Sequence, residues 1–161
     1  MELEIVRISE LTLDPNNARR HSTRNIEVIA NSLKEFGQRK PIVVTNSNVV
    51  IAGNGTLEAA QSLGWETITI TRAPKDWNAN QIKAYALTDN KTSELADWDS
   101  QILAEQLLEI SEVFDIQDFG FNPLSGESME ETNHEFQDFS DDVETQYRCP
   151  KCGYEWNGSA R

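Results

Sequence analysis

A chain of 161 residues, 38% of them hydrophobic, is long enough for one modest domain with an appendage and too short for two full-sized domains. No apolar segment is long enough to cross a bilayer, and the first residues lack the basic start and apolar centre of a secretory signal, so we expect a cytoplasmic protein. The formal charge of −13 argues against binding of duplex nucleic acid by the whole chain unless a partner supplies positive charge.

This charge is divided unevenly along the chain. Residues 1–85 hold ten Lys and Arg against nine Asp and Glu, a balance of +1, whereas residues 86–161 hold four against eighteen, a balance of −14. The first half is therefore able to meet a phosphate group, and the second half is expected to repel nucleic acid.

The first predicted elements are a strand and a helix. Residues 3–8 alternate between apolar and polar side chains, as a half-buried strand does, and Asp-Pro-Asn-Asn at 14–17 is a turn that ends this region. A helix that Ser22 or Thr23 can cap follows and ends at Gly37. Before this helix lie Arg19 and Arg20, whose guanidinium groups suit bidentate phosphate contact, although adjacent arginines are more often a solvated corner.

The stretch that organises the chain is a predicted β-hairpin that leads directly into a helix. Two β-branched runs, 42–44 and 49–52, flank a polar turn, and Gly53-Asn54-Gly55 then passes the chain into a helix over 56–63. The first N–H groups of a helix have no intrahelical acceptors, and glycine lets an anion approach the backbone closely. The pattern predicts an anion seat, while a glycine-rich turn that binds nothing is the simpler interpretation of the local sequence alone.

The chain is predicted to continue with one strand and two helices. Residues 66–71 alternate like a strand with one buried face. Residues 78–81 resemble a capping box that opens a helix, and Asp89-Asn90-Lys91 is expected to end it. Asp99 is expected to cap a further helix, whose apolar stripe over 102–110 packs on the domain or on a partner.

The C-terminal part combines an acidic linker with a pair of cysteines. Residues 122–146 lose the periodic pattern and are rich in Ser, Glu and Asp, which is typical of a disordered linker. Within residues 147–161, Cys149 and Cys152 have the spacing of the first knuckle of a zinc ribbon. Structural zinc needs four ligands, so the missing pair would come from a second copy of the chain, from His134 or from a partner, and a degenerate remnant is the alternative. A thioredoxin-type redox role is disfavoured, because no strand is expected before the cysteines and no helix after them.

Several boxes in a fixed order give the chain a resemblance to a known family. The boxes at 17–21 (Asn-Ala-Arg-Arg-His), 37–41 (Gly-Gln-Arg-Lys-Pro), 51–60 (Ile-Ala-Gly-Asn-Gly-Thr-Leu-Glu-Ala-Ala) and 87–91 (Leu-Thr-Asp-Asn-Lys) together resemble the ParB/sulfiredoxin superfamily. The resemblance covers residues 2–121. It is closest to the phage-type ParB-like N-terminal domain, which is often associated with DNA adenine methyltransferases. It implies an α+β fold with a small mixed sheet and flanking helices.

The resemblance also implies a pocket for CTP or ATP with magnesium. In ParB proteins the glycine box holds the triphosphate, a Gly-x-x-Pro-type segment lies against the base, and an acid-Asn pair reaches magnesium and phosphate. Carried over to this chain, the resemblance implies that the triphosphate is bound by Gly53, Asn54, Gly55 and Thr56, with Arg19 or Arg20 adding charge. It implies that Gln38 and Pro41 line the base side and that Asp89 and Asn90 bind magnesium. One carboxylate, one amide and phosphate oxygens form a chemically sound ligand set for magnesium.

The sequence departs from the family pattern in three places. The glycine box of the family usually carries an arginine where this chain has Thr56, so one phosphate donor is missing and hydrolysis is in doubt. Sulfiredoxins place their reactive cysteine in this box, in the neighbourhood of Asn54, so sulfiredoxin activity is excluded. We also expect no counterpart, after Phe121, of the helix-turn-helix domain with which chromosomal ParB reads DNA.

These observations predict a domain order and a function. We expect a ParB-like nucleotide-binding domain at 2–90 and a helical extension at 91–121 that packs on it, followed by the linker and the knuckle. The leading hypothesis is an accessory module in phage or mobile-element DNA modification or other DNA transactions. Its acidic tail and knuckle would recruit a methyltransferase or a DNA-packaging protein, and a second copy of the chain is a further candidate partner.

Two alternatives belong to other functional classes. The first is a phosphoryl-transfer enzyme, such as a weak nucleoside triphosphatase, a small-molecule kinase or a ParB-like nuclease, in which Glu58, Asp89 and a bound metal act. No paired-carboxylate cluster for two metals is visible in the sequence. The second is an interaction scaffold with a vestigial pocket, which Thr56 in place of arginine favours.

Overall fold

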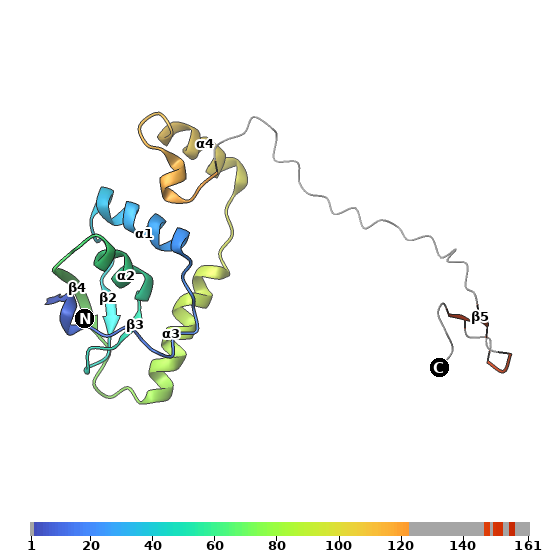
Figure 1. The fold of residues 1–161 in the computed structure, drawn as a ribbon, viewed down its shortest axis with the longest axis horizontal. Helices are drawn as coiled ribbons and strands as arrows, with labels where there is room; N and C mark the ends of the chain where they lie inside the picture. The colour runs from blue at the N-terminus through green and yellow to red at the C-terminus, as the bar shows by residue number, and fades with distance from the viewer. Residues whose placement is uncertain (1, 123–146, 149, 153–154, 157–161) are drawn as a thin grey trace. The chain divides into compact units, whose positions relative to one another are not determined.

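A four-stranded mixed sheet lies at the centre of the first of two units, residues 1–125 and 126–161, into which the chain divides. The computed structural model describes residues 2–122, 147–148, 150–152 and 155–156. The sheet has the order β1-β4-β2-β3 (Figure 1). Its strands are β1 (Glu4–Arg7), β2 (Ile42–Val44), β3 (Val50–Ala52) and β4 (Thr67–Arg72).

The pairing of these strands makes the sheet mixed. Strand β4 is antiparallel to β1 and parallel to β2, with Ile70 opposite both Glu4 and Ile42. Strands β2 and β3 form the predicted antiparallel hairpin. The predicted α+β fold with a small mixed sheet is therefore confirmed, and each strand lies within a residue or two of its predicted limits.

Helices flank the sheet along the first unit. Helices α1 and α2 pack against each other, and α3 contacts β3 (Figure 1). The helical elements in the described residues are η1 (Ile8–Glu10), α1 (Thr23–Phe36), α2 (Asn54–Ser62), α3 (Ala79–Glu94), α4 (Ser100–Ile110) and η2 (Ile116–Phe119).

The core lies between the sheet and the α1–α2 layer. The largest side chains with no exposure to solvent are Val44, Val50, Leu57 and Ile70, three from strands and one from α2. Each such apolar side chain contributes about 1.5–3 kcal/mol when fully buried. Ala59 and Ala60 are also fully buried on α2, and such small side chains allow a helix backbone to approach its neighbours closely.

The predicted helix starts are confirmed in their side-chain hydrogen bonds. Ser22 accepts a hydrogen bond from the N–H of Asn25 at the start of α1. Asn78 and Gln81 form the predicted reciprocal capping box of α3, and Asp99 caps α4. Side chains at these positions accept from N–H groups that have no partner within the helix.

One predicted helix end is wrong. Helix α3 does not stop at Asp89-Asn90-Lys91 but runs on to Glu94. No Gly or Pro interrupts it there, and the Asn90 side-chain amide donates to the Ala86 carbonyl one turn earlier at 2.8 Å, a bond compatible with a helix interior. No residue of α3 is fully buried, so its polar residues lie on an exposed helix wall.

The segment after α4 packs on α1. The Asn31 amide donates to the Asp118 carbonyl at 3.1 Å, and the Arg24 guanidinium donates to the Gln117 carbonyl. The Phe119 ring lies 5.5 Å from the ring of Phe36, centroid to centroid. Part of the helical extension is thus held by both polar and aromatic contacts.

Only part of the C-terminal unit is described. Strand β5 (Tyr147–Arg148) pairs antiparallel with β6 (Glu155–Trp156), so the expectation that no strand precedes the cysteines is wrong. Cys152 is exposed, while Cys149 and the predicted linker from residue 123 to 146 lie outside the described residues. In the described part of the chain, no helix combines the length and the hydropathy that a membrane span requires.

Replacement of glycine by alanine in the turn between β3 and α2 should lower the stability of the fold more than the same change elsewhere. Gly53 has φ +97°, and an added Cβ would lie 2.5 Å from Cγ2 of Ile42. Gly64 also has a positive φ, +72°, but its added Cβ would meet nothing within 4 Å. We expect Gly53→Ala to lower the free energy of unfolding by about 3 kcal/mol and Gly64→Ala by about 1 kcal/mol. Urea denaturation followed by circular dichroism measures both, and equal losses would contradict the role of the Ile42 contact.

Candidate functional site

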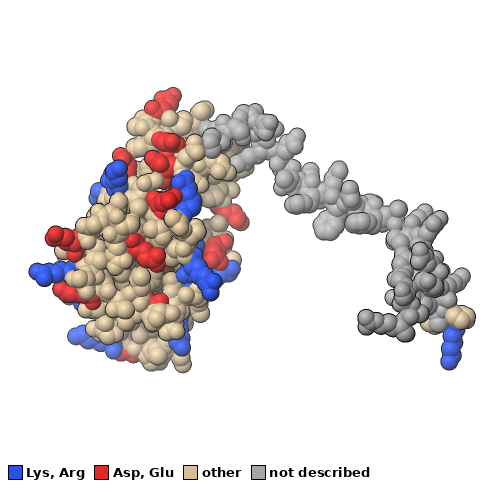
Figure 2. Space-filling model, in the orientation of Figure 1, with Lys and Arg blue, Asp and Glu red and all other residues tan. Residues whose placement is uncertain are grey.

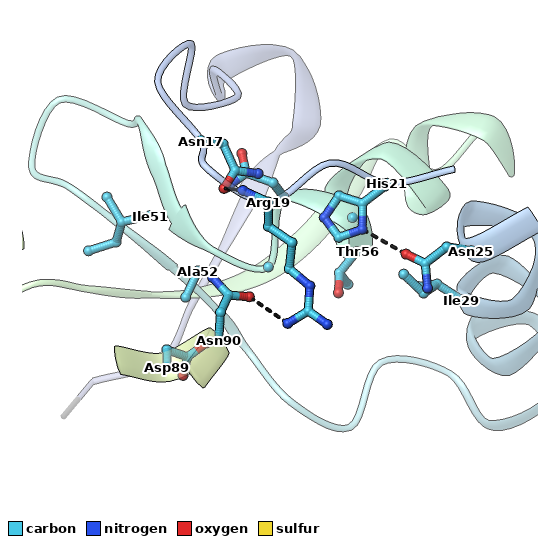
Figure 3. A pocket seen from close by; sticks show the side chains of 13 residues that line it. Asn17, Arg19, His21, Asn25, Ile29, Ile51, Ala52, Thr56, Asp89 and Asn90 are labelled. Atoms are coloured by element: carbon cyan, nitrogen blue, oxygen red, sulfur yellow. Dashed lines mark hydrogen bonds between the residues drawn. The ribbon is translucent and has the colours of Figure 1, made fainter. Parts of the chain in front are cut away.

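A pocket of about 250 Å³, here called the turn pocket, opens where three segments distant in sequence meet (Figure 3). These are the loop at 17–21, the turn at 53–56 and residues 89–90 of α3, with α1 closing one side. The lining residues are Asn17, Arg19, His21, Asn25, Ile29, Ile51, Ala52, Gly53, Asn54, Gly55, Thr56, Asp89 and Asn90.

The floor of the turn pocket is the start of α2. Gly53 is the N-cap in left-handed conformation, and the first helical bond runs from the N–H of Leu57 to the Gly53 carbonyl at 3.0 Å. The preceding N–H groups, at 54–56, have no acceptor within the helix. An anion above the turn would therefore meet free donors and the positive end of the helix dipole.

The Asn54 side chain serves the fold. It is buried, its Oδ1 accepts from the N–H of Asp14 at 3.0 Å, and its amide donates to the Val50 carbonyl at 3.4 Å. The loop before α1 is thereby fastened to the turn before α2. Asn54 can offer the pocket its backbone N–H, while its side chain is already used.

The loop at 17–21 contributes some of its side chains to the turn pocket. Asn17, Arg19 and His21 line this pocket, whereas Arg20 does not. Arg20 borders a different depression beside Lys91, which Arg19 also lines. The Asn17 side chain fixes this loop by accepting from the N–H of Arg19 at 3.2 Å.

Arg19 connects the loop to α3. Its Nη1 donates to Oδ1 of Asn90 at 3.0 Å, across 71 positions of sequence (Figure 3). The carboxylate of Asp89 lies beside this pair in the wall of the pocket. Burial raises the pKa of Tyr85, and the nearby Asp89 carboxylate raises it further, so this tyrosine is neutral at pH 7.

The structure brings together most, but not all, of the predicted site residues. Arg19, Gly53, Asn54, Gly55, Thr56, Asp89 and Asn90 line one pocket. Of the two predicted catalytic carboxylates, Asp89 lines this pocket, whereas Glu58, one turn farther along α2, is not among its lining residues. Pro41 and Arg20 also lie outside the lining of the turn pocket.

Gln38 has a structural role. Its Oε1 accepts from the N–H of Thr69 at 2.8 Å, and its amide donates to the carbonyls of Thr69 and Lys40 at 2.8 and 3.0 Å. The side chain thus pairs with β4 much as a neighbouring strand would. Gln38 also borders a second depression of about 590 Å³, here called the α1 groove. This groove shares Ile29 and Thr56 with the turn pocket. Its other lining residues are Val28, Ser32, Leu33, Phe36, Gly37, Arg39, Lys40 and Phe119.

Sequence reasoning missed three polar residues of the turn pocket, Asn17, His21 and Asn25. For two of them a signal exists in the sequence, because Asn17 and His21 belong to the same box at 17–21 as Arg19. Asn25 lies in the first turn of α1, where its Oδ1 accepts from Nδ1 of His21 at 2.7 Å. No local pattern could have identified it, since its orientation depends on how α1 packs over the turn.

The described residues contain no preformed cluster of metal ligands. No group of three or more His, Cys, Asp and Glu side chains comes together among them. In the turn pocket only Asp89 offers a carboxylate, and Oδ1 of Asn90 is already engaged by Arg19. A divalent cation would need oxygen ligands from a bound anion to complete its coordination there.

The chain is similar in sequence to proteins of one family. The sequence profile of the ParB N-terminal domain matches residues 1–91. Over 63 residues, 39% of this chain and 72% of the relative, the chain is 32% identical to the ParB-like nuclease domain-containing protein YnaK of Escherichia coli K12. Over 90 residues, it is 31% identical to the probable chromosome-partitioning protein ParB of Campylobacter jejuni, a match that covers 53% of this chain and 32% of that relative.

A solved structure has a similar fold. It is the C-terminally truncated ParB of Caulobacter crescentus complexed with CTP-γ-S, which aligns with a TM-score of 0.59 and 20% identity over 74% of this chain and 69% of that one. At this identity the likeness concerns the fold alone, and it confirms the ParB-like architecture that the sequence predicts.

Proposed function

Because the chain belongs to the ParB N-terminal domain family, we propose that it binds a nucleoside triphosphate, CTP or ATP, with the phosphates in the turn pocket. The observation that carries this proposal is the meeting of the glycine turn, Arg19 and the Asp89-Asn90 pair around one pocket. A relative of the same fold, the Caulobacter crescentus ParB, is complexed with CTP-γ-S.

The phosphates would be held by backbone and side-chain donors together. The N–H groups at 54–56 point out of the start of α2, and Arg19 supplies the permanent positive charge. To reach a phosphate, the Arg19 guanidinium would share or give up its bond to Asn90. In a bond to phosphate both partners are charged, whereas Asn90 is neutral, so the exchange favours the anion.

The base would lie toward the α1 groove. This groove shares Ile29 and Thr56 with the turn pocket, so the two depressions are adjacent and a ligand of nucleotide size would reach from one to the other. The segment from Gly37 to Lys40 borders the groove, in agreement with the base side proposed for Gln38 and, next to it, Pro41. Phe36 and Phe119 add the apolar and aromatic surface against which a base packs well.

Magnesium would enter with the nucleotide. Asp89 supplies one carboxylate and Asn90 one amide oxygen, and phosphate oxygens and water complete an octahedral set. Bound magnesium neutralises part of the phosphate charge and so offsets the repulsion between Asp89 and the triphosphate.

The wider role would be that of an accessory protein in phage or mobile-element DNA modification or other DNA transactions. This is supported by the sequence resemblance and by the acidic second half, which suits a protein partner, such as a methyltransferase or packaging protein, better than bare DNA. On the face shown in Figure 2, basic and acidic side chains are interspersed over the body, and acidic ones gather at the α4 end. Identification of the proteins that copurify with the full chain tests this role, and partners without activity on DNA would count against it.

Arg19 and Arg20 provide a matched pair of variants for the nucleotide site. We expect Arg19→Ala to weaken CTP or ATP binding by at least about tenfold, because it removes a charge-assisted contact worth about 1.5–3 kcal/mol. Arg20→Ala should change the affinity less than about twofold, because Arg20 is not among the residues that line the turn pocket. Isothermal titration of the full chain measures both. Absence of binding by the wild-type chain would overturn the proposed function.

The Asp89→Asn variant distinguishes the contribution of magnesium to nucleotide binding from that of direct contacts with the phosphates. Without magnesium, the variant should bind the nucleotide more tightly than the wild type, because a repelling carboxylate is gone. With magnesium, it should lose most of the gain in affinity that the wild type shows, about tenfold. Asp97→Asn, an exposed change beyond α3, serves as the control. An unchanged magnesium effect in Asp89→Asn would remove this residue from the metal site.

A zinc ion bound by the two cysteines would need two further ligands. The chain has two cysteines and structural zinc takes four ligands, so we propose a zinc ion shared by the Cys149 and Cys152 pairs of two copies. Metal analysis of the purified full chain should give about one zinc per two chains, which Cys149→Ser abolishes together with the dimer in sedimentation. One zinc per chain would instead indicate His134 or another ligand, and no zinc would indicate a degenerate remnant.

A further inference from the structure

His21 occupies the space directly above the glycine turn. A Cβ added at Gly55 would lie 2.8 Å from Cε1 and 3.0 Å from Nδ1 of this ring. The ring points into the turn pocket between the Arg19 and Asn25 side chains (Figure 3). Any anion that reaches the N–H groups of the turn must therefore lie against this imidazole.

The hydrogen bonding of the ring fixes its tautomer. Asn25 Oδ1 can only accept, so Nδ1 of His21 donates the bond of 2.7 Å between them. Asn25 is itself held, because its N–H donates to Oγ of Ser22 at the cap of α1. In the neutral ring Nε2 then carries a lone pair, and among the described residues no partner is bonded to it. A lone pair facing the pocket repels phosphate oxygens, whereas a protonated Nε2 attracts them.

The other charges around the turn pocket sum to zero, so a proton on His21 would give the pocket a net positive charge. Among its lining residues Arg19 carries a positive and Asp89 a negative charge, and these offset each other. The α1 residues that line it, Asn25 and Ile29, are uncharged, as are the lining residues from α2. Arg24, also in the first turn of α1, forms an ion pair with Glu27 and donates a hydrogen bond to the Gln117 carbonyl.

We propose that His21 is a phosphate ligand that binds as imidazolium, so that the nucleotide takes up a proton when it enters the turn pocket. The proposal rests on the nucleotide-binding function proposed above and adds a ligand to it. Nδ1–H stays on Asn25, and Nε2 gains a proton from solvent and donates it in a hydrogen bond to a phosphate oxygen. Binding and protonation therefore favour each other, and affinity rises as the pH falls.

Isothermal titration in buffers of different ionisation enthalpy measures this proton directly. At about pH 7.5 the wild-type chain should take up about half a proton or more per CTP or ATP bound. Its affinity should increase about threefold to tenfold between about pH 8 and about pH 6. The nucleotide's terminal phosphate also titrates in this range, so each value is compared with that of a variant.

His21→Gln and His134→Gln are the matched variants, because the chain has two histidines. Gln keeps a donor near the position of Nε2 but cannot take up a proton, so His21→Gln should bind with little proton uptake from the protein, whereas His134→Gln should behave as the wild type. Equal uptake by the wild type and His21→Gln would overturn this inference and leave nucleotide binding intact. Absence of binding in the wild type would overturn both. The pH titration of the His21 ring by NMR, with and without inorganic tripolyphosphate, gives a second readout, and identical curves would also overturn the inference.

Discussion

The left-handed turn at Gly53 is the constraint on which the rest of the site depends. It joins a buried strand to a buried helix with no residue between them, and its missing Cβ leaves room for Ile42. Because α2 starts there, its unpaired N–H groups open toward solvent at the edge of the sheet. Asn54 then uses its side chain to hold the Asp14 loop against the same turn, so one short segment positions both the floor and one wall of the turn pocket.

Polar contacts contribute to holding the α3 wall of the turn pocket, whereas the α1 wall packs on the core. Helix α3 buries no residue completely, and its link to the loop at 17–21 includes the bond between Arg19 and Asn90. A hydrogen bond with one charged partner, as here, contributes about 1.5–3 kcal/mol to stability at most. It can be exchanged for a bond to an anion. The site thus combines a rigid floor with walls whose polar groups are already oriented but not permanently occupied.

The distribution of charge separates the two tasks proposed for the chain. The turn pocket lies in the half of the chain that is close to neutral, where Arg19 and the start of α2 attract an anion. Residues 97–118 carry seven Asp and Glu and no Lys or Arg, so this segment of the chain contributes only negative formal charge. The proposed recognition of a phosphate and of a macromolecule would therefore use surfaces of opposite character.

The sequence by itself determined the individual strands of the sheet, the caps at Asn78 and Asp99, and the glycine turn, because hydrophobic period, capping chemistry and left-handed backbone are local properties. The mixed sheet followed from the family resemblance, because strand pairing is not a local property. Only the tertiary structure placed His21 over Gly55, left Arg20 out of the lining of the turn pocket, and paired Gln38 with β4, since each depends on how a loop or helix is seated on distant strands. The end of α3 was mispredicted for a related reason: polar residues alone do not stop a helix whose wall faces solvent.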